Sequence, residues 1–442
     1  MTTVTELAQC LQTVLTSRAD ALGRQTQFVR RQVKLTGALF TQILTFGWLA
    51  DPRATLDSLS QTAQTLGVHI SPQGLDERFS ASAAQCLQGT LEAAMTQLVE
   101  SAPRAIALLQ RFNGVYLLDS TTLSLPPALA RLWRGCGGSA GLQSAALKLQ
   151  VRLELLTGQL HVQLHAGRAS DRSAPLQHAA LPVGALRLAD LGYFDLNVLA
   201  SLDQQQAYWL TRPQAGTVLY SAQGERLDLA RYLQAQPAGE LDVPVQLGVR
   251  HHLAARLLAV RVRQDVADRR RQRLYAEAKR RAQAVSLERL RLADWTLYLT
   301  NVPPEQLSLS EACVLARTRW QIELLFKLWK SHAQLDESRS ANPWRVLCEI
   351  YAKLLGQLIQ HWLCLLGGWS QPDHSARKAA ATIQKHALHL ASAFATRRTE
   401  CLSQTLQLML RCLVAGCRIN KRRQQPHTFQ LLLQCSAQSA LA

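Results

Sequence analysis

Residues 316–330 read Ala-Arg-Thr-Arg-Trp-Gln-Ile-Glu-Leu-Leu-Phe-Lys-Leu-Trp-Lys. The stretch contains neither Pro nor Gly, and its apolar residues recur at the three- and four-residue spacing of one helix face: Ile322, Leu325, Phe326 and Trp329. We therefore predict a helix here that packs through this face. The elements around it must supply the surface on which it packs.

The same helix carries a second face of charged residues. Arg319, Glu323 and Lys330 share it, and Lys327 adds a further cation to the helix. One interpretation is an exposed helix held by salt bridges. The other is a functional carboxylate flanked by two cations, which requires acidic partners for Glu323 elsewhere in the chain.

Length and charge narrow the class of protein. A chain of 442 residues is long enough for several domains and a large core. Its net charge of +18 favours a polyanionic partner, and nucleic acid fits better than a membrane surface. A basic but otherwise ordinary enzyme is the alternative.

The cysteines and the ends of the chain indicate the compartment. Ten scattered Cys residues form no Cys-x-x-Cys pair and have no His at zinc spacing, as expected of buried thiols in a reducing cytosol. Residues 1–10 lack a secretion signal pattern. The most apolar region, 346–369, holds too many polar residues to cross a bilayer and reads as a core helix. We expect a cytoplasmic protein without a membrane anchor.

Residues 1–110 show helical periodicity. Within them, Leu56–Phe79 contains Gly67, where a helix ends, and Ser71-Pro72, where another begins. The pattern suits a helix-turn-helix that would present Gln73 and Arg78 to the major groove of DNA. It suits an ordinary helical hairpin equally well.

Short apolar runs from Gly114 onward predict strands. One run ends at Asp119, and another, Val183–Leu188, leads into Asp190, so both acids are expected at exposed strand tips. Residues 213–292 form a separate β-rich unit that ends in a very basic helix, Val266–Val285. Its arginines, among them Arg269, Arg270 and Arg273, suit contact with phosphates better than an ordinary solvated face.

Three acids then stand out by context. Asp119 and Asp190 at strand tips can meet Glu323 on its helix at one edge of a mixed sheet. Three carboxylates repel one another unless cations lie between them, and hard oxygen ligands suit two Mg²⁺ or Mn²⁺ ions. Such a pair of ions activates a water or a 3′-hydroxyl for attack on a phosphodiester.

These motifs resemble the DDE transposases of the insertion-sequence IS-four family. The third-acid motif of that family, Tyr-x2-Arg-x3-Glu-x6-Lys, matches at Arg319, Glu323 and Lys330, with Ala316 in the tyrosine position. The contexts Leu118-Asp119-Ser120-Thr121-Thr122 and Ala189–Asp195 also match, in the family's order. The resemblance extends over roughly residues 50–425.

The resemblance implies an α/β fold with an RNase H-like mixed sheet flanked by helices, a β-rich insertion, and helical N- and C-terminal regions. The division expected is 1–110 (DNA-binding), 111–212 and 293–370 (catalytic), 213–292 (insertion) and 371–442 (C-terminal). Arg319 and Lys330 would contact phosphates. Trp295 would stack on a flipped base, although its place in an apolar strand, Trp295–Thr300, suits a core role equally well.

The activity implied is cut-and-paste DNA transposition. The partners implied are the terminal inverted repeats of the element, its target DNA and a second copy of the chain. Two alternatives stay open at this level. One is a nuclease of the same fold that only hydrolyses DNA, and the other is a DNA-binding relative without catalysis, which the missing tyrosine at Ala316 would suit.

Overall fold

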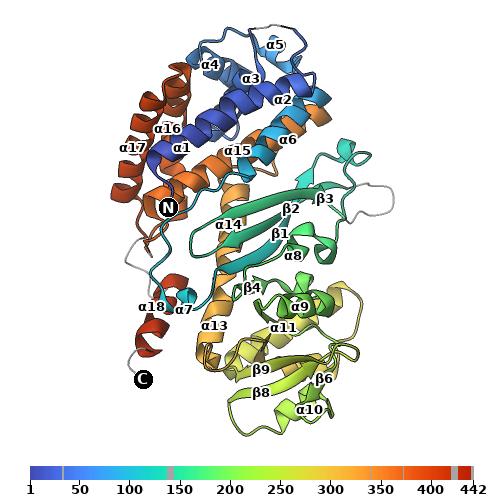
Figure 1. Ribbon diagram of the computed structural model, residues 1–442. Coiled ribbons are helices and arrows are strands. Elements are labelled where there is room, and N and C mark those ends of the chain that lie inside the picture. The colour runs from blue at the N-terminus through green and yellow to red at the C-terminus, as the bar shows by residue number, and fades with distance from the viewer. Residues whose placement is uncertain (32–33, 137–143, 339, 372, 420–426, 440–442) are drawn as a thin grey trace. The chain divides into compact units, whose positions relative to one another are not determined.

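The computed structural model describes residues 1–31, 34–136, 144–338, 340–371, 373–419 and 427–439 (Figure 1). The chain forms two compact units. Unit 1 comprises Met1–Ala105, Ser120–Ala169 and Trp320–Gln430, and unit 2 comprises Ile106–Asp119, Ser170–Arg319 and Leu431–Ala442. Two of the crossings between the units fall within a strand, after Asp119, and between two helices, after Arg319.

The described strands form one mixed sheet in the order β3-β2-β1-β4-β5-β10-β9-β8-β6-β7. In unit 2, β4 (Leu186–Ala189) pairs in parallel with both β1 (Val115–Leu125) and β5 (Tyr208–Thr211). In unit 1, β2 (Ala145–Glu154) and β3 (Leu160–Ala166) form an antiparallel hairpin. The order 3-2-1-4-5 with a parallel centre confirms the predicted mixed α/β fold of RNase H-like type.

The segment 213–292 continues this sheet. Its strands are β6 (Leu219–Ser221), β7 (Arg226–Leu227), β8 (Glu240–Leu247) and β9 (Leu253–Arg261), and its helices are α10 (Leu229–Gln234), α11 (Gln264–Arg280) and α12 (Leu287–Leu292). Strand β9 pairs antiparallel with β10 (Trp295–Thr300), which pairs with β5. Trp209, Leu257 and Leu299 lie in one buried cluster, so the inserted segment and the parallel strands share a core.

Unit 1 is built around α15 (Pro343–Gly368), which packs against α3 (Gly37–Ala50) and α6 (Ala81–Met95) (Figure 1). Nearly all of its side chains are buried, polar ones included, which confirms the expected core helix. The other helices of this unit are α1 (Val4–Gln12), η1 (Thr13–Arg18), α2 (Ala19–Gln25), α4 (Leu56–Thr65), α5 (Pro72–Asp76), α14 (Trp320–Ser331), α16 (Ala376–Ala395) and α17 (Thr399–Gly416). A short turn, η2 (Pro127–Leu129), follows β1.

The short helices of unit 2 connect its strands. They are α7 (Ala107–Gln110), η3 (Asp171–Ser173), α8 (Pro175–His178), η4 (Leu191–Tyr193), α9 (Leu196–Gln204) and α13 (Leu309–Thr318). The last helix, α18 (Thr428–Ser439), begins in unit 1 and continues into unit 2. None of the helices in the described ranges is long and apolar enough to span a membrane.

The predicted caps of the N-terminal helical pair are present. Gly67 takes a φ of 75° after α4, where only a residue without Cβ is unstrained. Ser71 accepts a hydrogen bond from Gly74 N–H, and Pro72 opens α5. Gln73 and Arg78 are exposed, but α5 has only five residues. That is shorter than the helices that usually enter a major groove, so DNA reading by this pair stays a prediction.

One expected helix differs from that observed. The helix predicted over 316–330 is divided at Arg319, which ends α13, and α14 begins at Trp320. The N-cap of α13 is Ser308, which places Glu311 three residues on and forms a reciprocal capping box. Between β3 and β4 the helices η3 and α8 are short, since Pro175 can begin a helix but not continue one.

A buried ion pair on α15 fixes the connection that follows α14. Lys353 lies 2.7 Å from Glu349, and the side chain of Lys353 is 1% exposed. The same ammonium donates hydrogen bonds to the carbonyls of Gln334 and Glu337, at 2.8 and 3.2 Å. Gln334 has a positive φ of 48°, which its non-glycine side chain tolerates because both ends of the turn are held.

We expect Lys353→Met to lower the free energy of unfolding by about 3–5 kcal/mol, because it leaves the Glu349 carboxylate buried without its cation. Urea denaturation followed by circular dichroism measures this. Replacing both members (Lys353→Met with Glu349→Leu) should recover much of the loss. The matched control is Lys385→Met on the exposed side of α16, with a change under about 0.5 kcal/mol. Wild-type stability of Lys353→Met would contradict the assigned role of the pair.

Candidate active site

The two predicted aspartates lie side by side in unit 2. Strands β1 and β4 are parallel, and Leu118 is aligned with Ala189, so the next residue along each strand is an acid, Asp119 or Asp190. The amide of Asp190 also donates a hydrogen bond to Leu118 O at 3.4 Å. Register alone therefore brings two carboxylates to one place on the sheet.

The expected strand tips need a correction for Asp119. Asp190 directly follows β4, as predicted, but β1 runs on from Asp119 to Leu125. The residues after the acid, Ser-Thr-Thr-Leu-Ser-Leu, include two β-branched side chains that favour the extended backbone. Asp119 is consequently within a strand and its side chain is 12% exposed, while the side chain of Asp190 is 49% exposed.

Arg319 is the cation that faces both acids. One of its terminal nitrogens, Nη1, lies 3.0 Å from Asp119 Oδ2 and 3.5 Å from Asp190 Oδ1. The first contact is also a hydrogen bond from the guanidinium. The guanidinium offsets the electrostatic repulsion between the two carboxylates.

The backbone after Asp190 is folded tightly against the same strands. The turn η4 buries Tyr193, which packs with Leu118 and Leu176. A Cβ on Gly192 would lie 3.0 Å from Asp171 Oδ2, so glycine permits the close approach of η3 to η4. A third carboxylate, that of Asp171, therefore lies beside the turn that follows Asp190.

The structure also shows a buried arginine that sequence reasoning missed. Arg187 lies within β4, between two leucines, and donates a hydrogen bond to Gln177 Oε1 at 3.0 Å. Burial lowers the pKa of its guanidinium to about 10, an effect that Tyr193 and Asp195 partly oppose. An arginine in the middle of a four-residue apolar strand was the available signal.

Helix α14 carries the remaining candidates, in unit 1. Glu323 lies in its first turn and is partly buried. Lys330 lies in its last turn and donates a hydrogen bond to Thr122 O at 2.6 Å, with Asp336 4.0 Å from the same ammonium. Lys327 is exposed and lies 4.1 Å from the ring centroid of Trp320. Lys330 thus reaches β1 three residues beyond Asp119.

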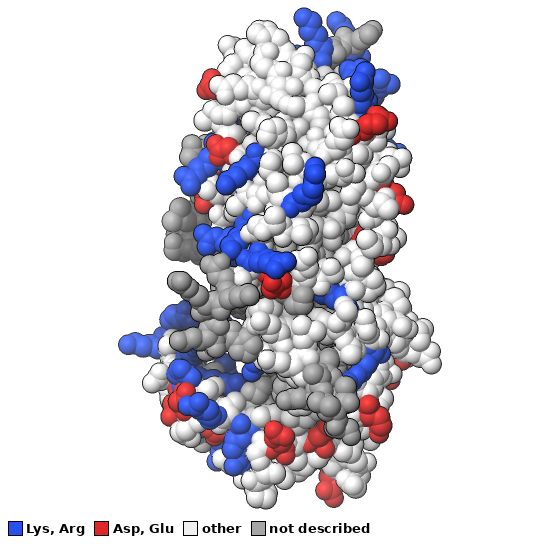
Figure 2. Space-filling view, turned by 90° about the vertical axis from the view of Figure 1, so that its left-hand side faces the viewer, with Lys and Arg blue, Asp and Glu red and all other residues white. Residues whose placement is uncertain are grey.

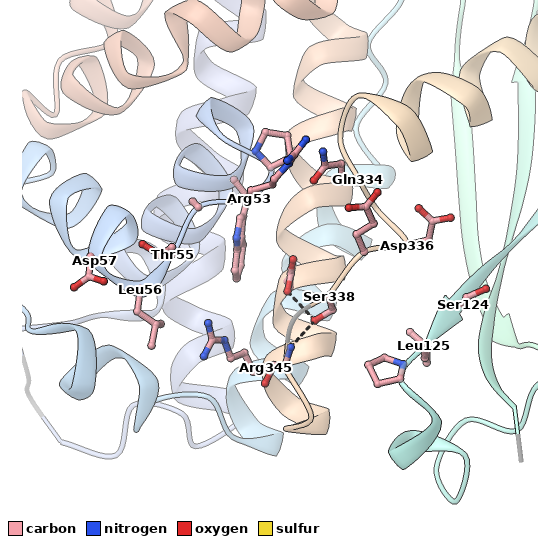
Figure 3. A pocket seen from close by; sticks show the side chains of 17 residues that line it. Arg53, Thr55, Leu56, Asp57, Ser124, Leu125, Gln334, Asp336, Ser338 and Arg345 are labelled. Carbon is pink, nitrogen blue, oxygen red and sulfur yellow. Dashed lines mark hydrogen bonds between the residues drawn. The ribbon is translucent and has the colours of Figure 1, made fainter. Parts of the chain in front are cut away.

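A pocket of about 680 Å³ opens beside this end of α14, within unit 1 (Figure 3). Figure 3 shows Arg53 and Asp57 from the segment around the start of α4, Ser124 from β1, Asp336 from the connection after α14, and Arg345 from α15. Arg345 pairs with Asp76 at 3.1 Å, and Ser338 donates to Glu349 at 3.0 Å. Its wall therefore mixes both signs of charge and is not a uniform anion site.

The other predicted DNA contacts have local partners in unit 2. Arg270 donates hydrogen bonds to Trp295 O at 2.7 Å and to Thr296 Oγ1 at 2.8 Å, and these bonds hold α11 on β10. Arg269 pairs with Asp265 at 2.9 Å. Arg273 is exposed. Trp295 is 5% exposed, in a cluster with Leu233 and Ala259, as the core interpretation of its strand requires.

Exposed basic residues also gather on the C-terminal helices of unit 1. The left-hand side of Figure 1, where α16 and α17 lie, faces the viewer in Figure 2, which shows blue side chains over this region. The exposed members are Arg377, Lys378, Lys385, Arg397, Arg398 and Arg411. The only acid within these two helices is Glu400.

The donor set of unit 2 fits a hard divalent cation. The carboxylates of Asp119 and Asp190 both lie close to one positively charged nitrogen of Arg319. Their oxygens therefore converge on a position that a cation can occupy. Within the described ranges, no group of three or more His, Cys, Asp and Glu side chains is assembled as a metal cluster. Glu323 belongs to unit 1, so the meeting of all three acids stays a prediction. All ten cysteines are free thiols.

A parallel β1–β4 core with adjacent aspartates defines a class of RNase H-like proteins that act on nucleic acids with divalent metal ions. The chain matches the family model "Transposase DDE domain" over residues 110–358, more than half of its length, and belongs to that family. It is accordingly a DNA transposase of the IS-four type. Enzymes of this family bind DNA, cleave it and transfer its strands, and they depend on divalent metal ions.

Named relatives agree with this assignment. The chain is 27% identical to the transposase of insertion sequence IS231E from Bacillus thuringiensis subsp. finitimus, over 93% of this chain and 91% of that protein. It is 23% identical to the transposase of IS1151 from Clostridium perfringens, over 77% of this chain and 76% of the relative. The putative transposase InsL of IS186A from Escherichia coli (strain K12) is 28% identical over 55% of this chain and 64% of its own.

We expect Trp295→Ala to lower the free energy of unfolding by about 3–5 kcal/mol, because the indole fills a packed site between the sheet and the helices α10 and α12. Thermal and urea unfolding measure it. The matched control is Trp320→Ala, since that ring is 44% exposed and its loss should cost under about 1 kcal/mol. Undiminished stability of Trp295→Ala together with lost DNA cleavage would instead favour stacking on a base.

Proposed function

We propose that Asp119, Asp190 and Glu323 are the catalytic metal ligands of this transposase. The observation that carries the proposal is the pairing of Asp119 with Asp190 across parallel strands, on one cationic nitrogen of Arg319. Glu323 is supported by its position, because the chain passes from Arg319 to α14 within one residue. Glu323 is thus four residues along the chain from Arg319, whose guanidinium faces the other two acids.

Bound divalent ions, with Mg²⁺ or Mn²⁺ proposed as a pair, would supply Lewis-acid polarisation of the phosphodiester and a nucleophile at neutral pH. The chain's own part is to hold the ligand carboxylates and to bind phosphates. Arg319 can donate two parallel hydrogen bonds to a phosphate, and Lys330 offers a point charge near β1. Lys327 adds a further exposed cation on α14.

The reaction sequence we propose is cut-and-paste. A water first attacks the phosphodiester at the element end and frees a 3′-hydroxyl. That hydroxyl then attacks a phosphodiester of the target DNA, so one bond is exchanged for another and no external energy source is required. Joining two ends requires them to be held together, which supports a homodimer on DNA. We propose a cytoplasmic location, as expected from the scattered free thiols.

The DNA interface is proposed to include exposed cations of both units. In unit 1 these are the basic side chains of α16 and α17, which have a single acid among them (Figure 2). In unit 2 they are the exposed arginines of α11, with Arg273 foremost. We also propose that the N-terminal helices bind the terminal repeats in a sequence-specific way. Each phosphate contact would contribute to a steep dependence of affinity on salt.

Asp119→Asn and Glu323→Gln should each reduce cleavage of element-end DNA by about a thousandfold or more, because each removes one ionised metal ligand while keeping the shape of the side chain. Cleavage is measured on labelled terminal-repeat duplexes with Mg²⁺ and with Mn²⁺. Binding to the same duplexes, measured by fluorescence anisotropy, should change less than about threefold.

The control is Glu288→Gln in α12, an exposed acid that should leave both measurements unchanged. Retention of full cleavage by either ligand variant would refute the assigned ligands. An assay with a pre-cut element end and target DNA distinguishes transposition from simple hydrolysis, because only a strand-transfer enzyme joins the pre-cut end to the target DNA.

A further inference from the structure

Arg319 has an arrangement that contact with phosphate alone does not explain. Its Nη1 lies 3.0 Å from Asp119 Oδ2 and 3.5 Å from Asp190 Oδ1, so a single terminal nitrogen faces an oxygen of each acid. Its side chain is 26% exposed and that of Asp119 is 12% exposed, so the first contact is substantially removed from water. The guanidinium occupies the position that a cation shared by the two carboxylates would take.

The surroundings show why a cation is required there. Asp119 and Asp190 are fixed side by side by the β1–β4 register, and Asp171 lies beside the turn that follows Asp190. Removing an ionised carboxylate from water is costly unless a positive charge compensates it. Arg187, the buried arginine of β4, donates to Gln177, whereas Arg319 forms an ion pair with each of the two acids.

The position of Arg319 in the chain allows it to leave. It lies between α13 and α14, at the single residue where the expected continuous helix is divided. It is also a residue at which the chain passes from unit 2 to unit 1. A side chain at such a boundary can be redirected by a small change of backbone angles, without unfolding either helix.

We propose that Arg319 is a placeholder cation, which holds Asp119 and Asp190 together before metal binds and is displaced from them by a divalent metal ion. This inference rests on the proposed function, because it takes the two aspartates as metal ligands. The displaced guanidinium is then the group that binds the phosphate of the DNA. Metal binding and DNA binding are thereby coupled, since both favour the state in which Arg319 has left the carboxylates.

The proposal predicts opposite effects on two properties of one variant. Arg319→Gln removes the competing charge, so the metal affinity of the DNA-free protein should rise by at least about tenfold, the effect of a unit charge at this distance even at the dielectric constant of water. Cleavage of DNA should fall, because the phosphate contact is lost as well. Arg319→Lys keeps the charge and should retain metal affinity close to that of the wild type.

Titration of the DNA-free protein with Mn²⁺, followed by the electron paramagnetic resonance signal of the free ion, measures the affinity without any turnover. Calorimetry with Mg²⁺ repeats the measurement. The matched control is Arg111→Gln, because Arg111 pairs with Glu311 at 2.9 Å and is 30% exposed but does not face the two aspartates. Its metal affinity should equal that of the wild type.

The outcomes separate the two proposals. Unchanged or weaker metal binding by Arg319→Gln, with Asp119→Asn weaker than the wild type, would overturn the placeholder role and leave the metal ligands intact. Metal binding by Asp119→Asn equal to that of the wild type would instead overturn the proposed ligand set itself. Tighter binding by Arg319→Gln and weaker binding by Asp119→Asn is the result expected.

Discussion

The site depends on one constraint, the parallel register of β1 and β4. Because Leu118 is aligned with Ala189, the residues that follow them bring two carboxylates together whatever the rest of the chain does. This juxtaposition is unfavourable by itself, since like charges in a partly buried position repel each other. The sheet core and the tightly packed turn η4 hold the strands against that repulsion, and the Arg319 guanidinium compensates it.

Helix α14 requires a different kind of support, because Glu323 and Lys330, which we propose as site residues, lie near its two ends. The ion pair of Lys353 with Glu349 lies in the core of unit 1 and fixes the turn after α14 through two backbone carbonyls. A buried charge pair contributes little net stability, but it permits only one geometry of the groups it bonds. The polar residues of 346–369, which argued against a membrane span, therefore help to hold the candidate site in place.

Much of this arrangement could be predicted from local sequence, and what could not has a physical cause. Alternating or continuous apolar runs located β4 and β10, and capping residues located α4 and α5. The break at Arg319 could not be predicted, because its backbone angles remain helical and no Pro or Gly marks it. Nor could the partners of Arg270, since residues 293–296 are distant in sequence and only the fold brings them to α11.

The distribution of charge also differs from what the sequence suggests. Helix α11 has the densest run of arginines, yet Asp265 and Asp268 on the same helix each pair with one of them, and Glu277 pairs with Arg281 just after the helix. A paired guanidinium attracts a phosphate less than a free one, because its partner repels the phosphate. On α16 and α17 the basic residues are fewer per turn but face a single acid. The two regions therefore carry the same net charge, +3 within α11 and +3 within α16 and α17 together, although α11 has more arginines.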